Sequence, residues 1–258
     1  MISNGVREEQ ISINSLKTNY KIAGSGPAIL ILHGWGSKAE RWVKVGEMLV
    51  ENGYKIIIPD LPGFGGTDVP PKPWGLNEYC GFIADFTKTL NLEKFYLLGH
   101  SFGGALAVKY TLRFPEKIEK LFLMASACIR KKTIKKWVLV RISKFFKIFS
   151  FLPFYALARK VFYKFIVSGS DYQYTKGVMK ESFLKVVNED LSKVLSLINV
   201  PTVIIWGAKD DTTLVEDAYF IEREINNSKL IIIPEGDHDL EQKMPEILTE
   251  KIIKNLTN

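Results

Sequence analysis

The sequence predicts an open α/β fold, in which helices flank a mostly parallel β-sheet. Short runs rich in Ile, Leu, Val and Phe alternate with segments of helical pattern. Because these runs are apolar at successive positions, they fit strands that are buried on both faces, as in a parallel sheet. The chain has 258 residues, of which 47% are hydrophobic, so it is long enough to bury a sizeable core.

The predicted elements follow one another in regular order. A hairpin at 11–14 and 16–22 is expected to add antiparallel strands at an edge of the sheet. Further strands are predicted at 28–32, 55–59, 95–98, 121–125, 202–206 and 229–233. Helices are predicted at 39–51, 77–90, 102–114, 215–225 and 245–256. Because strands and helices alternate, we expect crossover helices on an open sheet.

The alternation breaks once, for about seventy residues after the strand predicted at 121–125. From Ile134 to Phe149 the apolar residues recur at spacings of three and four, which predicts an amphipathic helix. Pro153 interrupts this pattern, and a second, aromatic-rich helix is expected at 154–167. The predicted domains are an α/β core of residues 1–127 and 200–258 and a helical cap of residues 128–199.

Positive charge is concentrated in this predicted cap. The chain has 35 Lys and Arg against 28 Asp and Glu, a net charge of +7, and twelve of the basic residues but no acidic one fall within 120–170. The rest of the chain holds 23 basic against 28 acidic residues. An acidic body with one basic segment is unlike a uniformly basic nucleic-acid-binding protein, so no nucleic acid partner is expected.

Cysteine usage and the first residues predict a cytoplasmic protein. Cys80 and Cys128 are the only cysteines, and neither has a partner at metal-ligand spacing, so no disulfide framework or zinc site is expected. Residues 1–10 are polar and lack the apolar core of a signal peptide. The uncharged run at 148–158 has eleven residues and contains proline, whereas a membrane-spanning helix needs about 20.

The motif GHSFGG at 99–104 is the most informative stretch of the chain. A serine in Gly-x-Ser-x-Gly, between a strand and a helix, indicates a nucleophile elbow. Such a turn is strained and accepts only small neighbours. It would place the hydroxyl of Ser101 at a helix N-terminus, where developing negative charge is stabilised. A glycine-rich turn that contains a serine by chance would have the same sequence. The catalytic partners of the serine must therefore distinguish a nucleophile elbow from such a turn.

An activated serine needs a base, and the chain has three histidines. His100 adjoins Ser101 and is expected to point away from it and to pack structurally. His33 follows a predicted strand and is expected to shape a loop. His238 lies in the loop after the strand at 229–233, where an α/β sheet places its functional groups. We therefore predict His238 as the base.

The acid that orients this base is expected to follow a strand as well. The sequence WGAKDD at 206–211 supplies it, with Asp210 preferred and Asp211 as the competitor, since one of the two could cap the next helix. The chain order Ser101, Asp210, His238 is the order expected for a nucleophile-elbow fold. Two backbone N–H groups, those of Phe102 and Trp35, are expected to form the oxyanion hole, each worth about 2.7–4 kcal/mol.

Together these motifs resemble those of the α/β-hydrolase superfamily, over nearly the whole chain. The resemblance rests on HGWG at 33–36, DLPGFG at 60–65, the elbow at Ser101, and the loops at 207–210 and 236–238. It implies a cofactor-free serine hydrolase, with no metal, and a lid inserted after the sixth strand. Haloalkane dehalogenases and epoxide hydrolases of this fold use an aspartate as nucleophile, so the serine at position 101 argues against both of these enzyme classes.

Within the superfamily, the chain is similar to pimeloyl-carrier-protein methyl ester esterases. The similarity lies in HGWG, Ala39, Glu40 and Trp42, followed by DLPGFG. Those enzymes use a lid to receive an acidic acyl carrier protein, which a basic cap would suit. The match departs at His100, where that group carries tryptophan. Meta-cleavage C–C bond hydrolases share the scaffold and the triad and stay an alternative.

The predicted function is carboxylic ester hydrolysis through an acyl-enzyme. The aromatic cap favours apolar acyl or aromatic substrates, although an aromatic stripe also serves packing. The residues predicted to contact substrate are Phe145, Phe149, Phe154 and Tyr155. The basic face of the cap is either solvated, a dock for an acidic carrier protein, or a contact with an anionic membrane, as in a lipase-like or monoacylglycerol-lipase-like enzyme. A non-enzymatic ligand-binding relative is a further alternative.

Overall fold

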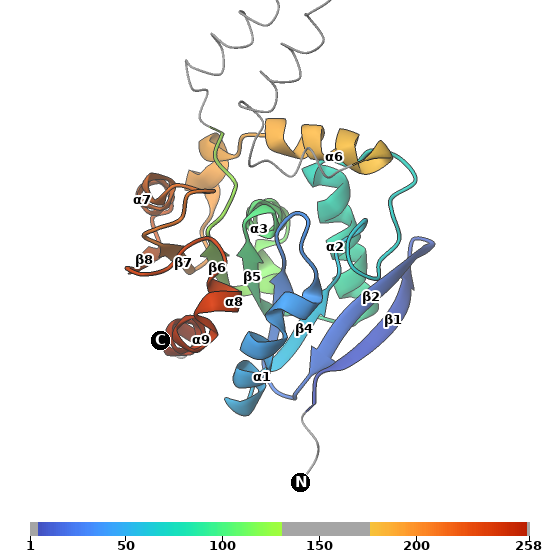
Figure 1. The fold of residues 1–258 in the computed structure, drawn as a ribbon, viewed down its shortest axis with the longest axis horizontal. Helices are drawn as coiled ribbons and strands as arrows, with labels where there is room; N and C mark the ends of the chain where they lie inside the picture. The colour runs from blue at the N-terminus through green and yellow to red at the C-terminus, as the bar shows by residue number, and fades with distance from the viewer. Residues whose placement is uncertain (1–4, 131–175, 257–258) are drawn as a thin grey trace, which may run out of the picture.

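The computed structural model describes residues 5–130 and 176–256, and within them one sheet of eight strands forms the centre (Figure 1). The strand order is β1-β2-β4-β3-β5-β6-β7-β8. The strands are β1 (Arg7–Ile13), β2 (Leu16–Ala23), β3 (Ala28–Leu32), β4 (Lys55–Pro59), β5 (Phe95–His100), β6 (Ile118–Met124), β7 (Thr202–Gly207) and β8 (Ser228–Ile233). Strand β2 pairs antiparallel with β1 and β4, and the pairings from β4 to β8 are parallel. The predicted parallel sheet with an antiparallel hairpin at its edge is confirmed.

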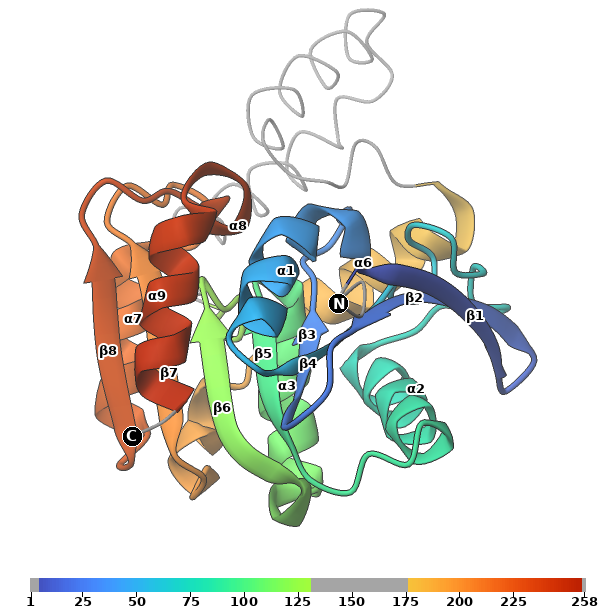
Figure 2. The same ribbon diagram turned by 90° about the horizontal axis from the view of Figure 1, so that it is seen from below.

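Helices cover both faces of the sheet (Figures 1 and 2). On one face α1 (Val43–Glu51) packs beside α9 (Pro245–Leu256). The other face carries α2 (Leu76–Thr89), α3 (Phe102–Arg113) and α7 (Val215–Glu224). Shorter or peripheral helices are η1 (Ala39–Trp42), η2 (Pro115–Lys117), α6 (Gly177–Asn188), η5 (Ser192–Leu197) and α8 (Leu240–Lys243).

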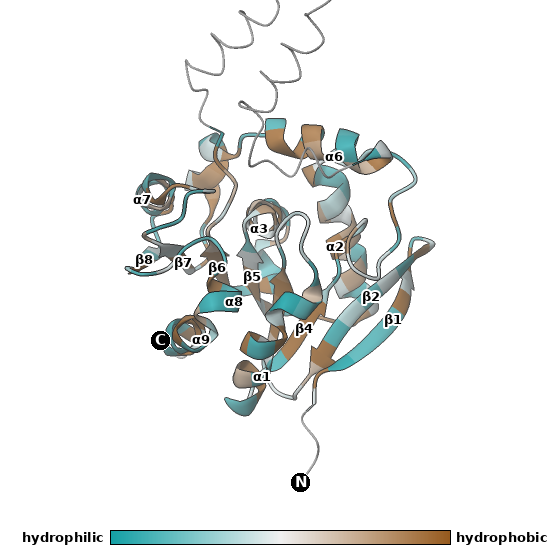
Figure 3. Ribbon diagram, viewed as in Figure 1, coloured by the Kyte–Doolittle hydropathy of each residue, from teal (hydrophilic) through white to brown (hydrophobic). Residues whose placement is uncertain are grey.

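The central strands supply both cores. In β3, Ile29 and Ile31 belong to the core beneath α1 and α9, whereas Leu30 and Leu32 belong to the core beneath α2 and α3, and all four are fully buried. Successive side chains of a strand point to opposite faces, so a run of apolar residues fills both cores. Figure 3 shows apolar and polar residues side by side on the covering helices, as expected of helices with one buried face.

Several boundaries differ from the prediction. The helix expected at 39–51 begins as the 3₁₀ turn η1 before α1. The strand expected at 121–125 begins earlier, at Ile118, and ends at Met124, because Ala125 turns into left-handed backbone with φ 45°. The helices α6 and η5 lie in the described part of the predicted cap, whose boundaries stay a prediction.

Some expectations fall outside the described residues. These are the two cap helices predicted within 131–175, together with Phe145, Phe149, Phe154 and Tyr155. In the part of the chain that the structure describes, no helix combines the length and the apolar composition needed to span a bilayer.

Candidate active site

Ser101 occupies a sharp turn between β5 and α3. Its backbone has φ 53° and ψ −114°, a strained conformation for a residue other than glycine, worth about 1–3 kcal/mol. Its N–H donates to the Met124 carbonyl at 3.0 Å, and its own carbonyl accepts the N–H groups of Gly104 at 3.0 Å and Ala127 at 2.9 Å. The turn is therefore held both by the first turn of α3 and by the end of β6.

Three glycines let the chain make this turn. A Cβ atom on Gly103 would lie 2.1 Å from the Leu32 carbonyl oxygen, and one on Gly104 would lie 2.4 Å from the Ser126 hydroxyl. At Gly99 a Cβ atom would lie 2.3 Å from the carbonyl oxygen of Gly103. Because every such contact is far below van der Waals distance, the motif permits α3 to begin directly against the ends of β3 and β6.

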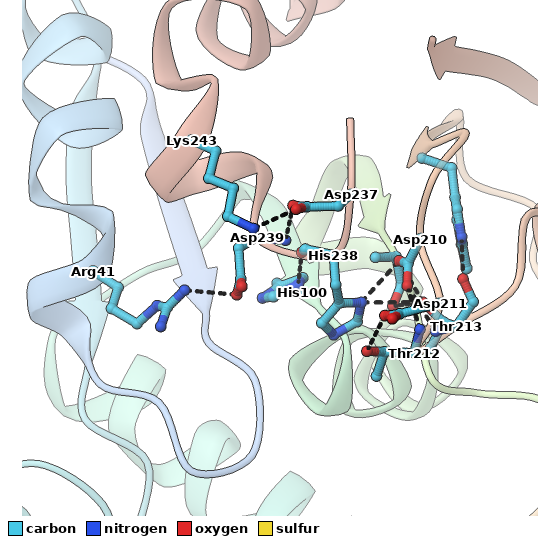
Figure 4. A network of polar contacts seen from close by, with 12 residues as sticks. Arg41, His100, Asp210, Asp211, Thr212, Thr213, Asp237, His238, Asp239 and Lys243 are labelled. Carbon is cyan, nitrogen blue, oxygen red and sulfur yellow. Dashed lines mark hydrogen bonds and ion pairs between the residues drawn. The ribbon is translucent and has the colours of Figure 1, made fainter. Parts of the chain in front are cut away.

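The predicted base and acid are in contact. The imidazole Nδ1 of His238, in the loop after β8, lies 2.8 Å from the Asp210 carboxylate oxygen Oδ2, in the loop after β7 (Figure 4). Asp211, the competing acid, is exposed and instead accepts the Thr212 hydroxyl. With Nδ1 directed to the carboxylate, Nε2 is the ring nitrogen of His238 that remains for proton exchange.

The carboxylate of Asp210 is held in its charged form. Its side chain is fully buried, and Oδ1 accepts the backbone N–H groups of Thr212 at 2.9 Å and Thr213 at 2.8 Å. Oδ2 accepts the Thr213 hydroxyl at 2.9 Å besides the contact with His238. Burial alone would raise the pKa of Asp210, but the hydrogen bonds from His238 and Thr213 outweigh it and hold the pKa below its usual value.

His100 joins the turn at Ser101 to the loop of His238. Its Nε2 lies 3.0 Å from the His238 carbonyl oxygen, and the two imidazole centroids are 4.8 Å apart. A carbonyl can only accept, so Nε2 carries the proton. Burial, followed by the neighbouring His238, lowers the pKa of His100 well below its usual value, so the ring is neutral. His100 packs structurally, as predicted, and also restrains the loop of the base.

A second link joins that loop to the segment after β3. The guanidinium of Arg41 in η1 donates to the Asp239 carboxylate at 2.6 Å and to the Glu241 carboxylate at 3.0 Å. Glu241 is 1% exposed, and burial raises its pKa. Arg41 therefore pairs a buried acid that follows His238 by three residues.

The predicted oxyanion loop, residues 33–36, is built on His33. The Leu61 N–H donates to its Nε2 at 2.9 Å, so Nδ1 carries the proton that goes to the Gly34 carbonyl at 2.7 Å. Burial lowers the pKa of His33 to about 4, which keeps the ring neutral. A Cβ atom on Gly34 would lie 3.4 Å from the Ser101 Cβ, so this loop lies directly against the predicted nucleophile.

Trp35 and Phe102, the predicted oxyanion donors, lie side by side. Their ring centroids are 5.2 Å apart, and the Trp35 ring also lies 5.3 Å from that of Phe183 in α6. Within residues 5–130 and 176–256, neither Trp35 nor Phe102 donates its backbone N–H to a backbone carbonyl. These two N–H groups are thus compatible with the predicted role, next to an apolar aromatic surface.

Neither Thr213 nor Arg41 was among the predicted site residues, and Asp60 had no predicted role. Asp60 accepts the Ala39 N–H at 2.6 Å and the Gly66 N–H at 2.8 Å, so it fixes the segment that follows the oxyanion loop. Its position directly after β4 was the available signal. Among the described residues, no three His, Cys, Asp or Glu side chains converge as metal ligands would.

The chain belongs to the α/β hydrolase family, whose model, described as the alpha/beta hydrolase fold, matches residues 27–160. The AB hydrolase superfamily protein YisY of Bacillus subtilis is 30% identical over 236 residues, 83% of this chain and 86% of that protein. Lipase 3 of Moraxella sp. is 24% identical over 229 residues, 83% of this chain and 72% of the lipase. The uncharacterized protein Rv2715 of Mycobacterium tuberculosis is 32% identical over 120 residues, 46% of this chain, so the match spans only 35% of that relative's length.

Solved structures share the fold. A membrane phospholipase A superposes with a TM-score of 0.77 at 23% identity, covering 98% of this chain and 86% of that one. A meta-cleavage product hydrolase from Pseudomonas fluorescens IP01 gives a TM-score of 0.74 at 21% identity, covering 97% and 98% of the two chains. The predicted fold is therefore confirmed, and the family model and the similarity to YisY confirm the predicted superfamily.

Proposed function

We propose that this protein is a serine hydrolase that cleaves carboxylic esters through an acyl-enzyme. The observation that carries the proposal is the 2.8 Å contact between His238 Nδ1 and the buried Asp210 carboxylate, on a loop tied through His100 to the strained turn of Ser101. Nucleophilic acyl transfer requires a serine on an elbow and an imidazole oriented by an acid, and the turn of Ser101 and the Asp210–His238 pair supply these two parts.

In the proposed mechanism, the Ser101 hydroxyl oxygen attacks the ester carbonyl carbon while His238 Nε2 takes its proton. Asp210, ionised and buried, stabilises the resulting imidazolium. The N–H groups of Trp35 and Phe102 hold the oxyanion. His238 then gives the proton to the leaving alcohol, and later removes a proton from the water that attacks the acyl-enzyme. The acid is released and the Ser101 hydroxyl is restored.

We propose apolar acyl or aromatic groups as the substrate class. Support comes from the rings that surround the proposed oxyanion donors, since Trp35 contacts Phe64, Phe102 and Phe183. The similarity to Lipase 3 of Moraxella agrees with an apolar ester. C–C bond hydrolysis stays the second candidate because the meta-cleavage product hydrolase shares the fold over nearly the whole chain.

The role of residues 128–199 as a cap is also proposed, and the positive charge within 120–170 supports an acidic carrier protein or an anionic membrane as its partner. Sedimentation with neutral and anionic liposomes tests the membrane. Salt-sensitive turnover of carrier-linked esters, without salt sensitivity for small esters, tests the carrier protein.

The test of the proposed reaction is a panel of p-nitrophenyl esters of graded chain length, together with a meta-cleavage dienoate. Ser101→Ala should abolish turnover while the far-ultraviolet circular dichroism stays unchanged. Asp210→Asn should lower kcat by about 10³-fold or more, whereas the adjacent Asp211→Asn should keep it. Undiminished esterase activity in Ser101→Ala would overturn the proposal, and turnover of the dienoate alone would favour C–C hydrolysis.

A further inference from the structure

One hydroxyl group reaches three parts of the site. The Thr213 oxygen Oγ1 lies 2.9 Å from Asp210 Oδ2, 3.1 Å from the Ala125 carbonyl oxygen and 3.3 Å from His238 Nδ1. Asp210 and His238 come from the loops after β7 and β8 (Figure 4), and Ala125 follows the end of β6. Thr213 is buried, with 8% of its surface exposed, so water does not replace its hydroxyl readily.

The single proton of the Thr213 hydroxyl limits the hydrogen bonds that this group can donate. A threonine hydroxyl has one proton, and neither the Asp210 carboxylate nor the Ala125 carbonyl has one to give. The hydroxyl therefore donates to one of these two oxygens, and toward His238 Nδ1, at 3.3 Å, it is only a second, longer acceptor of the proton that Nδ1 donates to Asp210 at 2.8 Å. When it donates to Asp210, Oδ2 has two donors, the Thr213 hydroxyl and the His238 imidazole, to match the two backbone N–H groups on Oδ1.

The surrounding backbone fixes where this hydroxyl lies. The indole N–H of Trp206, a fully buried side chain of β7, donates to the Thr213 carbonyl at 2.8 Å. Ala125 has φ 45°, uncommon for a residue other than glycine, and its N–H donates to the Ile205 carbonyl at 3.1 Å. Strained backbone persists where the surroundings determine it, so the acceptor beside Thr213 is held in place.

We propose that Thr213 is a positioning residue for the Asp210–His238 pair, an inference that rests on the proposed function. Its hydroxyl fixes the orientation of the carboxylate and takes up part of its negative charge, so that the proton on His238 stays at Nδ1 and Nε2 stays free to act as a base. Loss of the hydroxyl would leave more charge on the carboxylate, which would hold a protonated imidazole more strongly.

Other charged or titratable groups surround the pair among the described residues. His100 lies beside the ring of His238, Asp237 directly precedes His238, Arg41 of η1 pairs with the residue that follows His238, and Asp211 follows Asp210. The Thr213 hydroxyl contacts none of these four. A substitution that removes only the hydroxyl therefore leaves their charges in place.

The test compares Thr213→Val, which removes the hydroxyl at similar shape, with Thr213→Ser, which keeps it. Thr212→Val is the matched control, because the Thr212 hydroxyl contacts Asp211 and only its backbone N–H contacts Asp210. With a p-nitrophenyl ester, Thr213→Val should lower kcat about tenfold and move the acid limb of the kcat/KM profile up by about half a pH unit. Thr213→Ser and Thr212→Val should follow the wild type within about twofold.

A merely structural role would lower the amount of folded protein without moving the acid limb. An unmoved acid limb in Thr213→Val, or a shift in Thr213→Ser equal to that in Thr213→Val, would overturn the inference. Should Thr213→Val fail to fold, the same comparison is made with Thr213→Ala and Thr213→Ser. The proposed function fails separately, if the wild type turns over no ester of the panel or if Ser101→Ala retains activity.

Discussion

Acid should destabilise this fold through His33. The ring is fully buried, and its two nitrogens are committed to one donated and one accepted hydrogen bond, with the Gly34 carbonyl and the Leu61 N–H. A second ring proton would point at the N–H of Leu61, so the native state keeps the neutral form. Burial accordingly lowers the pKa of His33 from 6.5 to about 4.

The size of the effect follows from this shift. Between pH 6.5 and about 4 the unfolded chain binds more protons at this residue than the native protein, so stability rises with pH. The contribution is complete above the unfolded value, and by about pH 5 the loss amounts to about 2 kcal/mol. His100, whose pKa burial also lowers, adds a loss of the same sign.

The assay is guanidinium unfolding at about pH 7.5 and about pH 5, for the wild type and His33→Gln. Glutamine offers a donor and an acceptor but does not titrate. The wild type should lose about 2 kcal/mol more than the variant between the two pH values, while His100 and the carboxylates contribute equally to both proteins. Equal losses in the two proteins would show that His33 does not cause this loss of stability in acid.

Two further predictions concern stability, each measured by guanidinium unfolding. Gly103→Ala should lower the free energy of unfolding by more than about 3 kcal/mol or prevent folding, because its Cβ would lie 2.1 Å from the Leu32 carbonyl oxygen. The control Gly81→Ala in α2, where nothing lies within 4 Å of the added Cβ, should raise it by about 0.5–1 kcal/mol. Similar effects of the two substitutions would contradict this prediction. Arg41→Met should lower the free energy of unfolding by about 3 kcal/mol, because the buried Glu241 carboxylate loses its cation. The control Lys44→Met, which removes an exposed ion pair with Glu246, should change it little. An unchanged stability of Arg41→Met would show that the Arg41–Glu241 pair does not stabilise the fold.

Much of the sheet could be predicted from local sequence. The strands at Ala28–Leu32 and Lys55–Pro59 match their expected bounds, because a run of apolar residues flanked by polar ones is itself the cause of a doubly buried strand. The prediction that β6 ends at residue 125 was wrong, because the backbone conformation of Ala125 is set by contacts with neighbouring loops rather than by its residue type. The helix α6 lies within the segment predicted to be helical, but its own bounds were not predicted, because one of its buried residues is the polar Ser182, whose hydroxyl accepts the Trp74 N–H.

The candidate site, like the sheet, could be predicted only in part. The order of the motifs predicted which loops meet, but the choice between Asp210 and Asp211 depended on the path of one turn, which local pattern does not encode. Arg41 lies 198 residues from Asp239, and Thr213 lies 88 residues from Ala125. These two contacts could not be predicted from the sequence, because the residues meet only when the sheet brings their loops together. Neither an arginine nor a threonine forms a recognisable motif with a partner so far away in the chain.

The proposed function depends on Ser101 acting as a nucleophile that His238 activates. Intact-mass and peptide analysis after treatment with a fluorophosphonate tests it most directly. One adduct per chain is expected, on Ser101, and it should be absent in Ser101→Ala and form much more slowly in His238→Ala. An adduct on another residue, or undiminished labelling of Ser101→Ala, would contradict it.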